Sequence, residues 1–472
     1  MHNDKESPFN LRLLDNDLSL QVVRFSGREG LNQPYCFDIN VIGLAPAIDV
    51  ECLLGRPVFL ETGANSGIHG VVQNVSLESR GINRIAYTLA LVPRLQALNQ
   101  QHQRRIFQQQ SVPMILRQLL DEQDWPADSY RFELTTGHYP VRPFCIQYEE
   151  SSLGLFQRLC EEEGIHYHFE HQRNGHVLVL ADDSLRFSPE PLLMPFRTEN
   201  AQSTELMVSE LYQRHVAPSL AARQDVPSPV AFNGDDAAAN HAFVASAQTL
   251  NRGTDEQRYR DQRSRRHLER LRCRHLQVQG QSNHRALHSG CIMQLAEHPL
   301  SHFNDQWLVI EATHEGSQPS ILADDPAAMA SSYNNRFTAV PWSTVFRPAL
   351  EQSRPSIPGY QPARVCGVPG QAARMDDRGR IAVTLWPNEP TAPVETPGLW
   401  LNIALATLDA PARRPLAGSD VLVSFLDSDP DRPVICAVMP TCEEPRPVPP
   451  RERPGDTRLL LDWLVNRAGP AS

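Results

Sequence analysis

The stretch CIQYEESSLGLFQRLCEEEGIHYHFEH, from Cys145 to His171, changes its hydrophobic period and thereby indicates how the chain combines helices with strands. Ser151 or Ser152 can cap a helix here, and Gly164 stands where that helix is expected to end. The apolar residues between them fall on one helical stripe: Leu155, Phe156, Leu159 and Cys160. After the glycine the period becomes two, which predicts a strand with these residues on one face: Ile165, Tyr167 and Phe169.

Upstream of this stretch, apolar and polar residues alternate between Gln21 and Val92, as they do in antiparallel strands. Two runs carry the pattern most clearly: Tyr35, Phe37, Ile39 and Val41, then Ile85, Tyr87, Leu89 and Leu91. Ser111 and Pro113 then predict the start of a helix with these apolar positions: Met114, Ile115, Leu119 and Leu120. The sequence therefore predicts an antiparallel barrel or sandwich followed by helices.

Downstream of the same stretch, a charged helix is expected from Asp255 to Leu271, and strands resume near Ile292 and Trp307. Prolines crowd the region 341–362, which indicates a stiff linker between domains. A strand-rich unit of about 80 residues follows, with a turn at 376–379, and its size and strand number are typical of an OB-like barrel. A second proline cluster, Pro440–Pro454, closes it.

Composition limits the possible functions. The chain has 472 residues and a formal charge of −11, which opposes broad binding to nucleic acid or anionic lipid. The N-terminal residues carry no apolar signal region and no stretch approaches the roughly 20 apolar residues of a membrane span, so we expect synthesis in the cytosol without signal-peptide export and no stable membrane span. The nine cysteines are odd in number and contain no C-x-x-C pair, which favours small buried side chains over disulfides or zinc ligands.

Common catalytic and nucleotide-binding signatures are absent from the sequence, so we expect no enzyme activity, no catalytic residues and no cofactor. The best metal candidates are His166 and His168, which share one strand face; His171 has the opposite parity, and no suitably spaced fourth ligand is evident. We therefore interpret these histidines as solvent-facing strand residues. On that interpretation, replacing His166 and His168 together by alanine should leave the fold intact.

Three charged segments have a possible chemical interpretation and a structural one. The run Asp427, Asp429, Asp431 resembles the start of a calcium loop, but Arg432 and Val438 occupy the positions that need glycine and glutamate, so an acidic turn is expected. The three glutamates at 161–163 point in different directions on a helix and are interpreted as a charged helix end. The arginine-rich helix at 255–271 also carries acidic residues, which favours a solvated helix with local ion pairs over an RNA-binding face.

Several separated segments together resemble the VgrG family and the related hub and spike proteins of contractile phage tails. They occur in the family's order and extend from about Phe9 to Met439. They are FSGREGLNQPYCFDINVI (Phe25 to Ile42), RIFQQQSVP (Arg105 to Pro113), the opening stretch from Cys145 to His171, HPLSHFNDQWLVIEATHEG (His298 to Gly316), YNNRFTAVPWSTVFRP (Tyr333 to Pro348) and DVLVSFLDSDPDRPVI (Asp420 to Ile435).

The resemblance implies a mainly β chain with α+β elements, in which two barrel-like hub subdomains with inserted helices precede a small OB-fold barrel. We expect the hub region at 1–345, with barrel one at about 9–100 and the helices and second barrel at about 101–345. A proline-rich linker at 346–362, the OB-fold domain at 363–439 and a tail at 440–472 would follow. Two features depart from the family: an alanine- and proline-rich approach to Asp420, and no repeats of a long β-helical needle after the barrel.

The resemblance also implies a function. The chain would form a homotrimer that sits on a hexameric tube of the Hcp type, and sheath contraction would drive tube, spike and attached effectors out of the cell. It would be assembled in the cytoplasm and then secreted. Three alternatives are a hub of a contractile prophage tail or extracellular injection particle, a spike with an added enzymatic domain, and an OB protein that binds oligosaccharide or nucleic acid. The 33 residues from 440 onward are too few for an enzymatic domain, and the negative charge opposes the OB-ligand alternative.

The tail carries the partner-docking candidates. Asp456 to Arg467 is predicted to form a short helix after a stiff spacer, with apolar residues at i, i+4 spacing: Leu459, Leu460, Trp463 and Leu464. A helix of about three turns is marginal alone and needs a partner surface. That surface is either the protein's own OB barrel or the other tails of the trimer, or else an effector, an adaptor or a PAAR-type tip protein.

Overall fold

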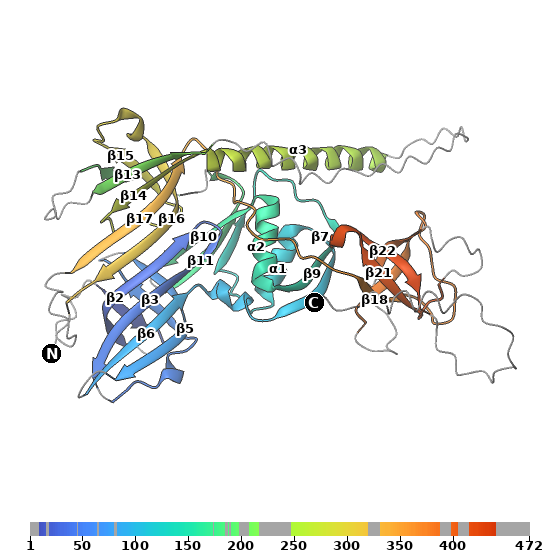
Figure 1. Cartoon of the computed structure of the whole chain (residues 1–472), viewed down its shortest axis with the longest axis horizontal. Helices are drawn as coiled ribbons and strands as arrows, with labels where there is room; N and C mark the ends of the chain where they lie inside the picture. The colour runs from blue at the N-terminus through green and yellow to red at the C-terminus, as the bar shows by residue number, and fades with distance from the viewer. Residues whose placement is uncertain are drawn as a thin grey trace, which may run out of the picture. The chain divides into compact units, whose positions relative to one another are not determined.

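The computed structural model describes residues 9–15, 18–44, 46–63, 66–79, 83–172, 174–184, 187, 190–197, 207–216, 247–319, 331–387, 398–404 and 415–439. The chain divides into two compact units, Met1–Ser356 and Ile357–Ser472. Figure 1 shows the strands of the first unit in blue to yellow and those of the second in orange to red. Each unit has its own sheet system and is described separately.

The first half of unit one is a ring of six paired strands. They are β1 (Asn10–Leu13), β2 (Ser19–Gly30), β3 (Gln33–Leu44), β4 (Pro57–Glu61), β5 (Gly67–Ser79) and β6 (Arg84–Val92). Antiparallel pairing runs in the order β1-β4-β5-β6-β3-β2, and β2 pairs back to β1, so the ring closes. On β3 the expected alternation is confirmed, because the four apolar residues from Tyr35 to Val41 are buried and the three polar positions between them are exposed.

The second half of unit one is a set of six strands in the order β12-β15-β16-β17-β14-β13. They are β12 (Leu192–Pro195), β13 (Val208–His215), β14 (Leu276–Ser282), β15 (Ile292–Ala296), β16 (Gln306–Ser317) and β17 (Ser332–Pro341). Strand β16 also pairs with β2, which places Gly316 opposite Phe25 and joins both halves into one 12-stranded sheet. A Cβ on Gly316 would lie 2.2 Å from the Phe25 ring, so this crossing requires glycine.

Between the two halves lies a mixed segment of strands and helices. It contains β7 (His102–Gln110) paired with β9 (Arg142–Ser151), and a three-stranded sheet of β10 (His166–Gln172), β11 (Gly175–Ala181) and β8 (Tyr130–Glu133). Helix α1 spans Val112–Asp121 and α2 spans Ser152–Glu163, and the two lie side by side (Figure 1). The long helix α3, Ala247–His275, leads into β14.

The capping of α2 follows its sequence. The Ser151 hydroxyl accepts a hydrogen bond from the Gly154 backbone N–H at 3.0 Å, and Gly164 ends the helix with a left-handed φ of 64°. The α1 prediction was right except at Met114, which is 54% exposed while Leu116 is buried instead. Tertiary packing on α2 selects one face of α1, and Met114 falls outside it.

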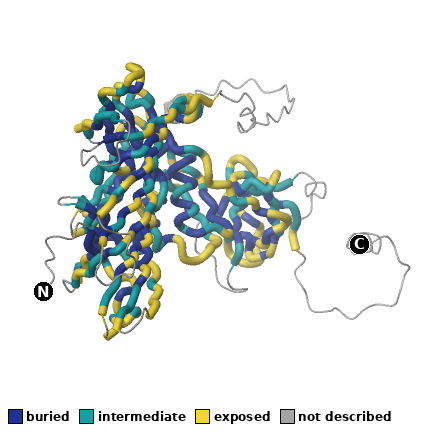
Figure 2. Tube along the Cα trace, turned by 60° about the vertical axis from the view of Figure 1, so that its left-hand side comes forward, coloured by how far each residue is buried: buried dark blue, intermediate teal, exposed yellow. Residues whose placement is uncertain are grey.

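One continuous core joins the first ring of strands to the central helices. It includes Phe25 and Phe37 of the ring together with Phe156 of α2 and Tyr167 of β10. Figure 2 shows the buried positions in dark blue through the middle of the strand-rich body, with exposed positions toward its ends. The cysteines only partly fit the expected burial, because Cys36 and Cys52 are exposed. None of the eight described cysteines forms a disulfide.

Unit two is a closed five-stranded barrel in the order β18-β19-β20-β22-β21. Its strands are β18 (Tyr360–Val365), β19 (Ile381–Leu385), β20 (Leu399–Ile403), β21 (Asp420–Phe425) and β22 (Pro433–Val438). The turn before β19 closes as expected: Asp376 accepts hydrogen bonds from the backbone N–H groups of Arg378 and Arg380, and Gly379 has a φ of 73°. The expected mainly β fold with a small OB-like barrel is therefore confirmed.

Among the described helices, none is both long enough and apolar enough to cross a membrane.

Candidate functional site

The two histidines considered as metal ligands lie on one face of β10, as their spacing predicted, but they are buried. His166 is 0% exposed and His168 is 6% exposed, so the solvent-facing interpretation was wrong. Their rings lie against Phe187, with centroid distances of 4.8 Å and 5.2 Å. Both faces of β10 are covered, because Tyr167 on its other face packs into the main core. Parity gives the shared face of a strand, but it does not show what covers that face.

The environment of these rings keeps them neutral. Burial lowers the pKa of His166 well below its ordinary value and lowers the pKa of His168 to about 4. Both ring nitrogens of His166, and Nδ1 of His168, have no hydrogen-bond partner among the residues that the structure describes. The nearby Glu170 carboxylate is engaged by Arg131. In the described part of the chain, no group of three or more metal-binding side chains has a geometry that could hold an ion.

His171 points to the opposite face of β10, as its parity predicted, and joins a cluster with two other histidines. Its Nδ1 accepts a hydrogen bond from the His69 backbone N–H at 3.2 Å, and His69 Nδ1 lies 2.9 Å from His176 Nδ1. The Tyr35 hydroxyl donates to the His69 carbonyl at 2.5 Å. Burial lowers the pKa of His69 and His171 to about 4 and that of His176 to about 3.

The calcium-like run in unit two forms a turn closed by hydrogen bonds within the chain. Arg432 donates to the Asp427 carboxylate at 2.6 Å, and Asp429 accepts from the Asp431 backbone N–H at 3.0 Å. The docking candidates Leu459, Leu460, Trp463 and Leu464 lie outside the described residues, and their role stays a prediction.

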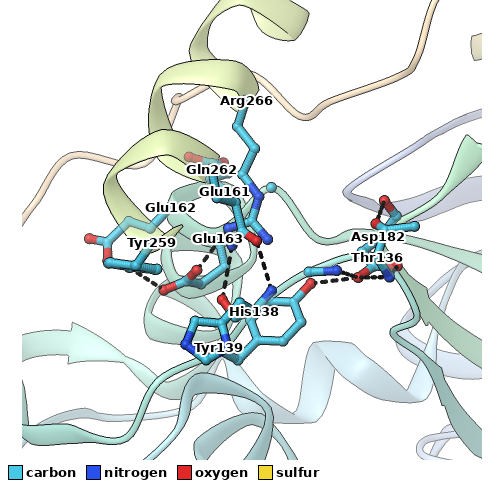
Figure 3. Close-up of polar contacts among 12 residues, drawn as sticks. Thr136, His138, Tyr139, Glu161, Glu162, Glu163, Asp182, Tyr259, Gln262 and Arg266 are labelled. Carbon is cyan, nitrogen blue, oxygen red and sulfur yellow. Dashed lines mark hydrogen bonds and ion pairs between the residues drawn. The ribbon is translucent and has the colours of Figure 1, made fainter. Parts of the chain in front are cut away.

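The most highly connected polar site lies where α2 ends. Its three glutamates diverge, as expected for neighbours on a helix, but each one meets a different set of partners. Glu163 is buried, with 1% of the residue exposed, and its carboxylate accepts from Arg142 at 2.7 Å, from Arg266 at 2.9 Å and from the Tyr259 hydroxyl at 2.7 Å. Figure 3 shows Glu163 between Tyr259 and Arg266 of α3. A buried carboxylate is thus neutralised by arginines from β9 and α3.

The second glutamate of this site, Glu162, contacts three arginines. Arg142, Arg158 and Arg354 lie 3.2 Å, 3.3 Å and 3.2 Å from its carboxylate oxygens. Burial alone would raise the pKa of Glu162, but these arginines lower it on balance. It therefore stays ionised at neutral pH.

The third glutamate, Glu161, binds backbone rather than side chains. Its Oε2 accepts from the backbone N–H groups of Glu351 and Gln352, both at 2.8 Å. Burial raises its pKa, although these two hydrogen bonds oppose the rise. Glu161 thereby holds the chain just before the end of unit one at Ser356.

The segment 345–354, which we call the strap, is attached along its length to α2, α3 and the end of β11. Arg347 donates to Glu269 at 2.7 Å, to the Gly164 carbonyl at 3.1 Å and to the Asp182 carbonyl at 2.6 Å. The Arg270 side chain donates to the Pro348 carbonyl at 2.9 Å. The start of the region interpreted as a linker is therefore fixed to the hub through both backbone and side chains.

A second carboxylate fixes the loop that faces α3. Asp182 accepts backbone hydrogen bonds from Thr135, Thr136 and Gly137, and a hydroxyl bond from Tyr139 at 3.0 Å (Figure 3). Burial opposes ionisation of Asp182, but these donors lower its pKa on balance. The same loop contacts α3, because Gln262 accepts from the His138 N–H at 2.7 Å and donates to its carbonyl at 2.9 Å.

Helix α3 is therefore only partly the solvated helix that its charges suggested. The expected local ion pairs occur near its start, where Arg258 meets Asp255 and Arg260 meets Glu256. Its inner face is buried and polar, and was missed: Gln262, Arg266, Glu269 and Cys273. The signal was present in their spacing of i, i+4, i+7 and i+11, which marks one helical face.

This network holds helices, a loop and a strap together, and its carboxylates are already neutralised by arginine, tyrosine and backbone donors. A shallow groove of about 480 Å³ lies elsewhere, on the sheet face of β13, β14, β16 and β17, and includes Tyr212, Glu311 and Arg336 in its lining. The arrangement is suited to fixing the positions of elements.

Comparisons with known proteins agree with this architecture. The model of the family described as phage tail baseplate hub (GPD) matches residues 28–320. The chain is 35% identical to the type VI secretion system spike protein VgrG4b of Pseudomonas aeruginosa over 98% of its own length and 60% of the relative's. It is 33% identical to VgrG5 of the same organism, over 91% of this chain and 57% of the relative. The chain thus spans less than two thirds of the length of these relatives.

Among solved structures, the chain is similar to the Escherichia coli c3393 protein, with a TM-score of 0.67 and 25% identity over 91% of this chain and 99% of that one. That protein is described as a component of the type VI secretion system that is structurally similar to the phage T4 tail proteins gp27 and gp5. The family resemblance that the sequence motifs suggested is confirmed. The chain belongs to the phage tail baseplate hub (GPD) family, and within it the chain is similar to type VI secretion VgrG proteins.

Proposed function

We propose that this chain acts as a VgrG-type spike protein, a homotrimeric hub that caps a hexameric Hcp-type tube and carries effectors outward when the sheath contracts. In this proposal the trimer assembles in the cytoplasm and is then secreted with the tube. An effector, an adaptor or a PAAR-type tip protein would travel with it. The role is structural rather than enzymatic.

The observation that carries this proposal is the order of two architectures in one chain. A phage-hub match at 28–320 precedes a separate closed five-stranded barrel, and the same combination aligns with 99% of a type VI secretion component. A hub must present a repeated surface to a ring, and closed cyclic symmetry supplies such a surface. The strap supports a mechanical role, because it fastens the hub's last residues to two helices just before the barrel begins.

Light scattering on the purified full chain, alone and with its tube protein, tests the proposal. We expect three copies of the 53.0 kDa chain in the particle, either for the chain alone or in its complex with the tube protein, whose own mass is then added. In the host, deletion of the gene should abolish secretion of the tube protein, and the wild-type gene should restore it. A chain that stays monomeric with the tube protein present would contradict the hub assignment.

A further inference from the structure

Helix α3 carries two arginines and a leucine that line up along one exposed side of the helix, beside the face that contacts the polar network. We call this row the arginine ridge, and its residues are Arg265, Leu268 and Arg272, at i, i+3 and i+7. Both arginines are exposed, and Leu268 is 53% exposed at the middle of the row. Over these positions a helix rises about 10 Å.

The ridge is held in a fixed orientation by the buried face of the helix. The buried Arg266 pairs with Glu163 at 2.9 Å, Glu269 pairs with Arg347 at 2.7 Å, and Gln262 makes two hydrogen bonds with His138. In Figure 3, Tyr259, Gln262 and Arg266 all lie on the side of α3 that faces the network. The rotation of the helix is therefore set, and the ridge is presented outward without further ordering.

The charges of the ridge are not neutralised within the described chain. Near the start of α3, Arg258 and Arg260 each have an acidic partner one turn earlier, at Asp255 and Glu256. After Asp261 the helix has only one carboxylate, Glu269, which is turned inward to Arg347. No ion pair to a ridge arginine occurs among the residues that the structure places.

The stability of the helix itself explains only some of these exposed arginines. Arg272 and Arg274 lie in the last turn, where positive charge is favourable to the helix dipole. Arg265 lies farther from the helix end and gains no such stabilisation. Leu268 is one turn from both Arg265 and Arg272, so an apolar side chain is exposed between two unpaired cations. An apolar centre flanked by arginines is typical of a protein contact surface.

We propose that the arginine ridge docks an acidic helical segment of a partner protein, with carboxylates on Arg265 and Arg272 and an apolar side chain on Leu268. Arginine binds carboxylates in a bidentate, planar geometry that lysine does not offer. The described part of α3 has eight arginines against four carboxylates, so the rest of this chain is more acidic than its overall charge of −11. A long polyanion such as nucleic acid would be repelled beyond the ridge, whereas a short acidic helix would not.

Site-specific crosslinking in the native host tests this proposal and does not depend on the proposed function. A photoreactive benzoylphenylalanine replaces Leu268 in the full chain, and mass spectrometry identifies the crosslinked peptide. We expect a peptide of another protein with at least three carboxylates within about two helical turns. The same probe at the exposed Gln257 on the paired part of α3 should give no such crosslink.

A second test reverses the charge of the ridge arginines. In the 268 probe background, Arg265→Glu with Arg272→Glu should lower the crosslinked fraction about tenfold or more. Arg258→Glu is the matched control, because Arg258 already pairs with Asp255, and it should leave the crosslink intact. The proposal is overturned by crosslinks that go only to nucleic acid, to another copy of this chain or to a peptide without an acidic run. No crosslink at all, or an unchanged one in the reversed variant while its melting curve matches the wild type, would overturn it as well.

Discussion

Glu163 and Arg266 form an ion pair whose side chains are 2% and 3% exposed, so neither charge has water to stabilise it. Arg142 and Tyr259 complete the donors around the Glu163 carboxylate. Such a pair contributes little net stability compared with an apolar pair, but the loss of one partner leaves the other charge buried and uncompensated. The ion pair should therefore affect stability most clearly when only one of its two partners is replaced.

We expect Arg266→Met to lower the free energy of unfolding by about 3–5 kcal/mol, because Glu163 then keeps a buried charge with fewer donors. The double variant Arg266→Met with Glu163→Gln should lose less than the sum of the two single variants, since both charges are gone. Urea unfolding followed by circular dichroism measures both. Arg258→Met, which breaks only an exposed pair, is the control and should leave the unfolding midpoint unchanged. Strict additivity of the two buried replacements would contradict the coupling.

The buried histidines give the protein a predictable dependence on acid. In the folded state burial lowers the pKa of His69 and His171 to about 4 and of His176 to about 3, whereas an unfolded histidine titrates near 6.5. Between these values the unfolded chain binds more protons, so stability is full above about pH 6.5 and falls as the pH drops toward 4. Arg94 and His288 also face this cluster and oppose protonation, while Glu29 favours it.

Urea midpoints measured between pH 4 and pH 8 test this expectation. The midpoint of the first unit should fall steadily below pH 6.5, and His176→Gln should make that slope shallower because one titrating ring is removed. His302→Gln, at an exposed histidine, should leave the slope as it is in the wild type. A flat profile from pH 8 to pH 4 would show that these rings are not buried in solution.

At the scale of single residues, sequence spacing predicted which face of the strand each histidine lies on, but not whether that face is buried. The shared face of His166 and His168 and the opposite face of His171 were both right. Their burial was not predictable, because Phe187 and Phe346 reach His166 from outside the strand and far along the chain. The double replacement by alanine, expected to be neutral from the sequence, is therefore now expected to destabilise the hub by removing rings that pack on Phe187.

At the scale of elements, the contact between α2 and the strap fixes the last segment of unit one. The helix itself was predictable, since its cap at Ser151, its apolar stripe and its stop at Gly164 are all local. The attachment of the strap was not predictable, because Glu161 and Gln352 are 191 positions apart in the chain. Local patterns predict an element, whereas its partners depend on topology.

We expect Glu161→Ala to release the strap without unfolding the helix. Two backbone N–H groups lose a charged acceptor, which costs about 1.5–3 kcal/mol per bond, so hydrogen exchange at 351 and 352 should speed up by about ten- to hundredfold. Endoproteinase Glu-C should then cut after Glu351 faster than in the wild type. Glu256→Ala removes an exposed carboxylate on α3 and should change neither rate. Unchanged exchange at 351 and 352 in Glu161→Ala would mean that the strap is held by other contacts.

At the scale of the whole molecule, the chain divides into two compact units, and each has buried apolar residues of its own. In unit one, Phe25, Phe37 and Phe156 belong to one core that joins the first ring of strands to α2. In unit two, the barrel strands close on themselves and bury their own apolar residues, among them Val383, Leu401 and Val423. The order of motifs predicted a mainly β fold that includes a small barrel, because each motif covers a turn or strand whose pattern is local. Periodicity could not predict that β16 pairs with β2 and thereby joins the two hub halves into one 12-stranded sheet.

Two units that each have their own sheets predict two unfolding transitions. Differential scanning calorimetry of the full chain, at one fixed concentration, should resolve two transitions rather than one, because each unit has its own sheet system and its own buried apolar residues. Phe156→Ala, at a side chain that is 0% exposed, should cost about 3–5 kcal/mol and lower only the transition of unit one. Leu401→Ala, at a side chain that is 2% exposed, should cost about 2–5 kcal/mol and lower only that of the barrel. The fragment 357–439 should melt at the temperature of the barrel transition. If either variant shifts both transitions together, or the fragment does not fold, the two units stabilise each other and the barrel depends on the hub.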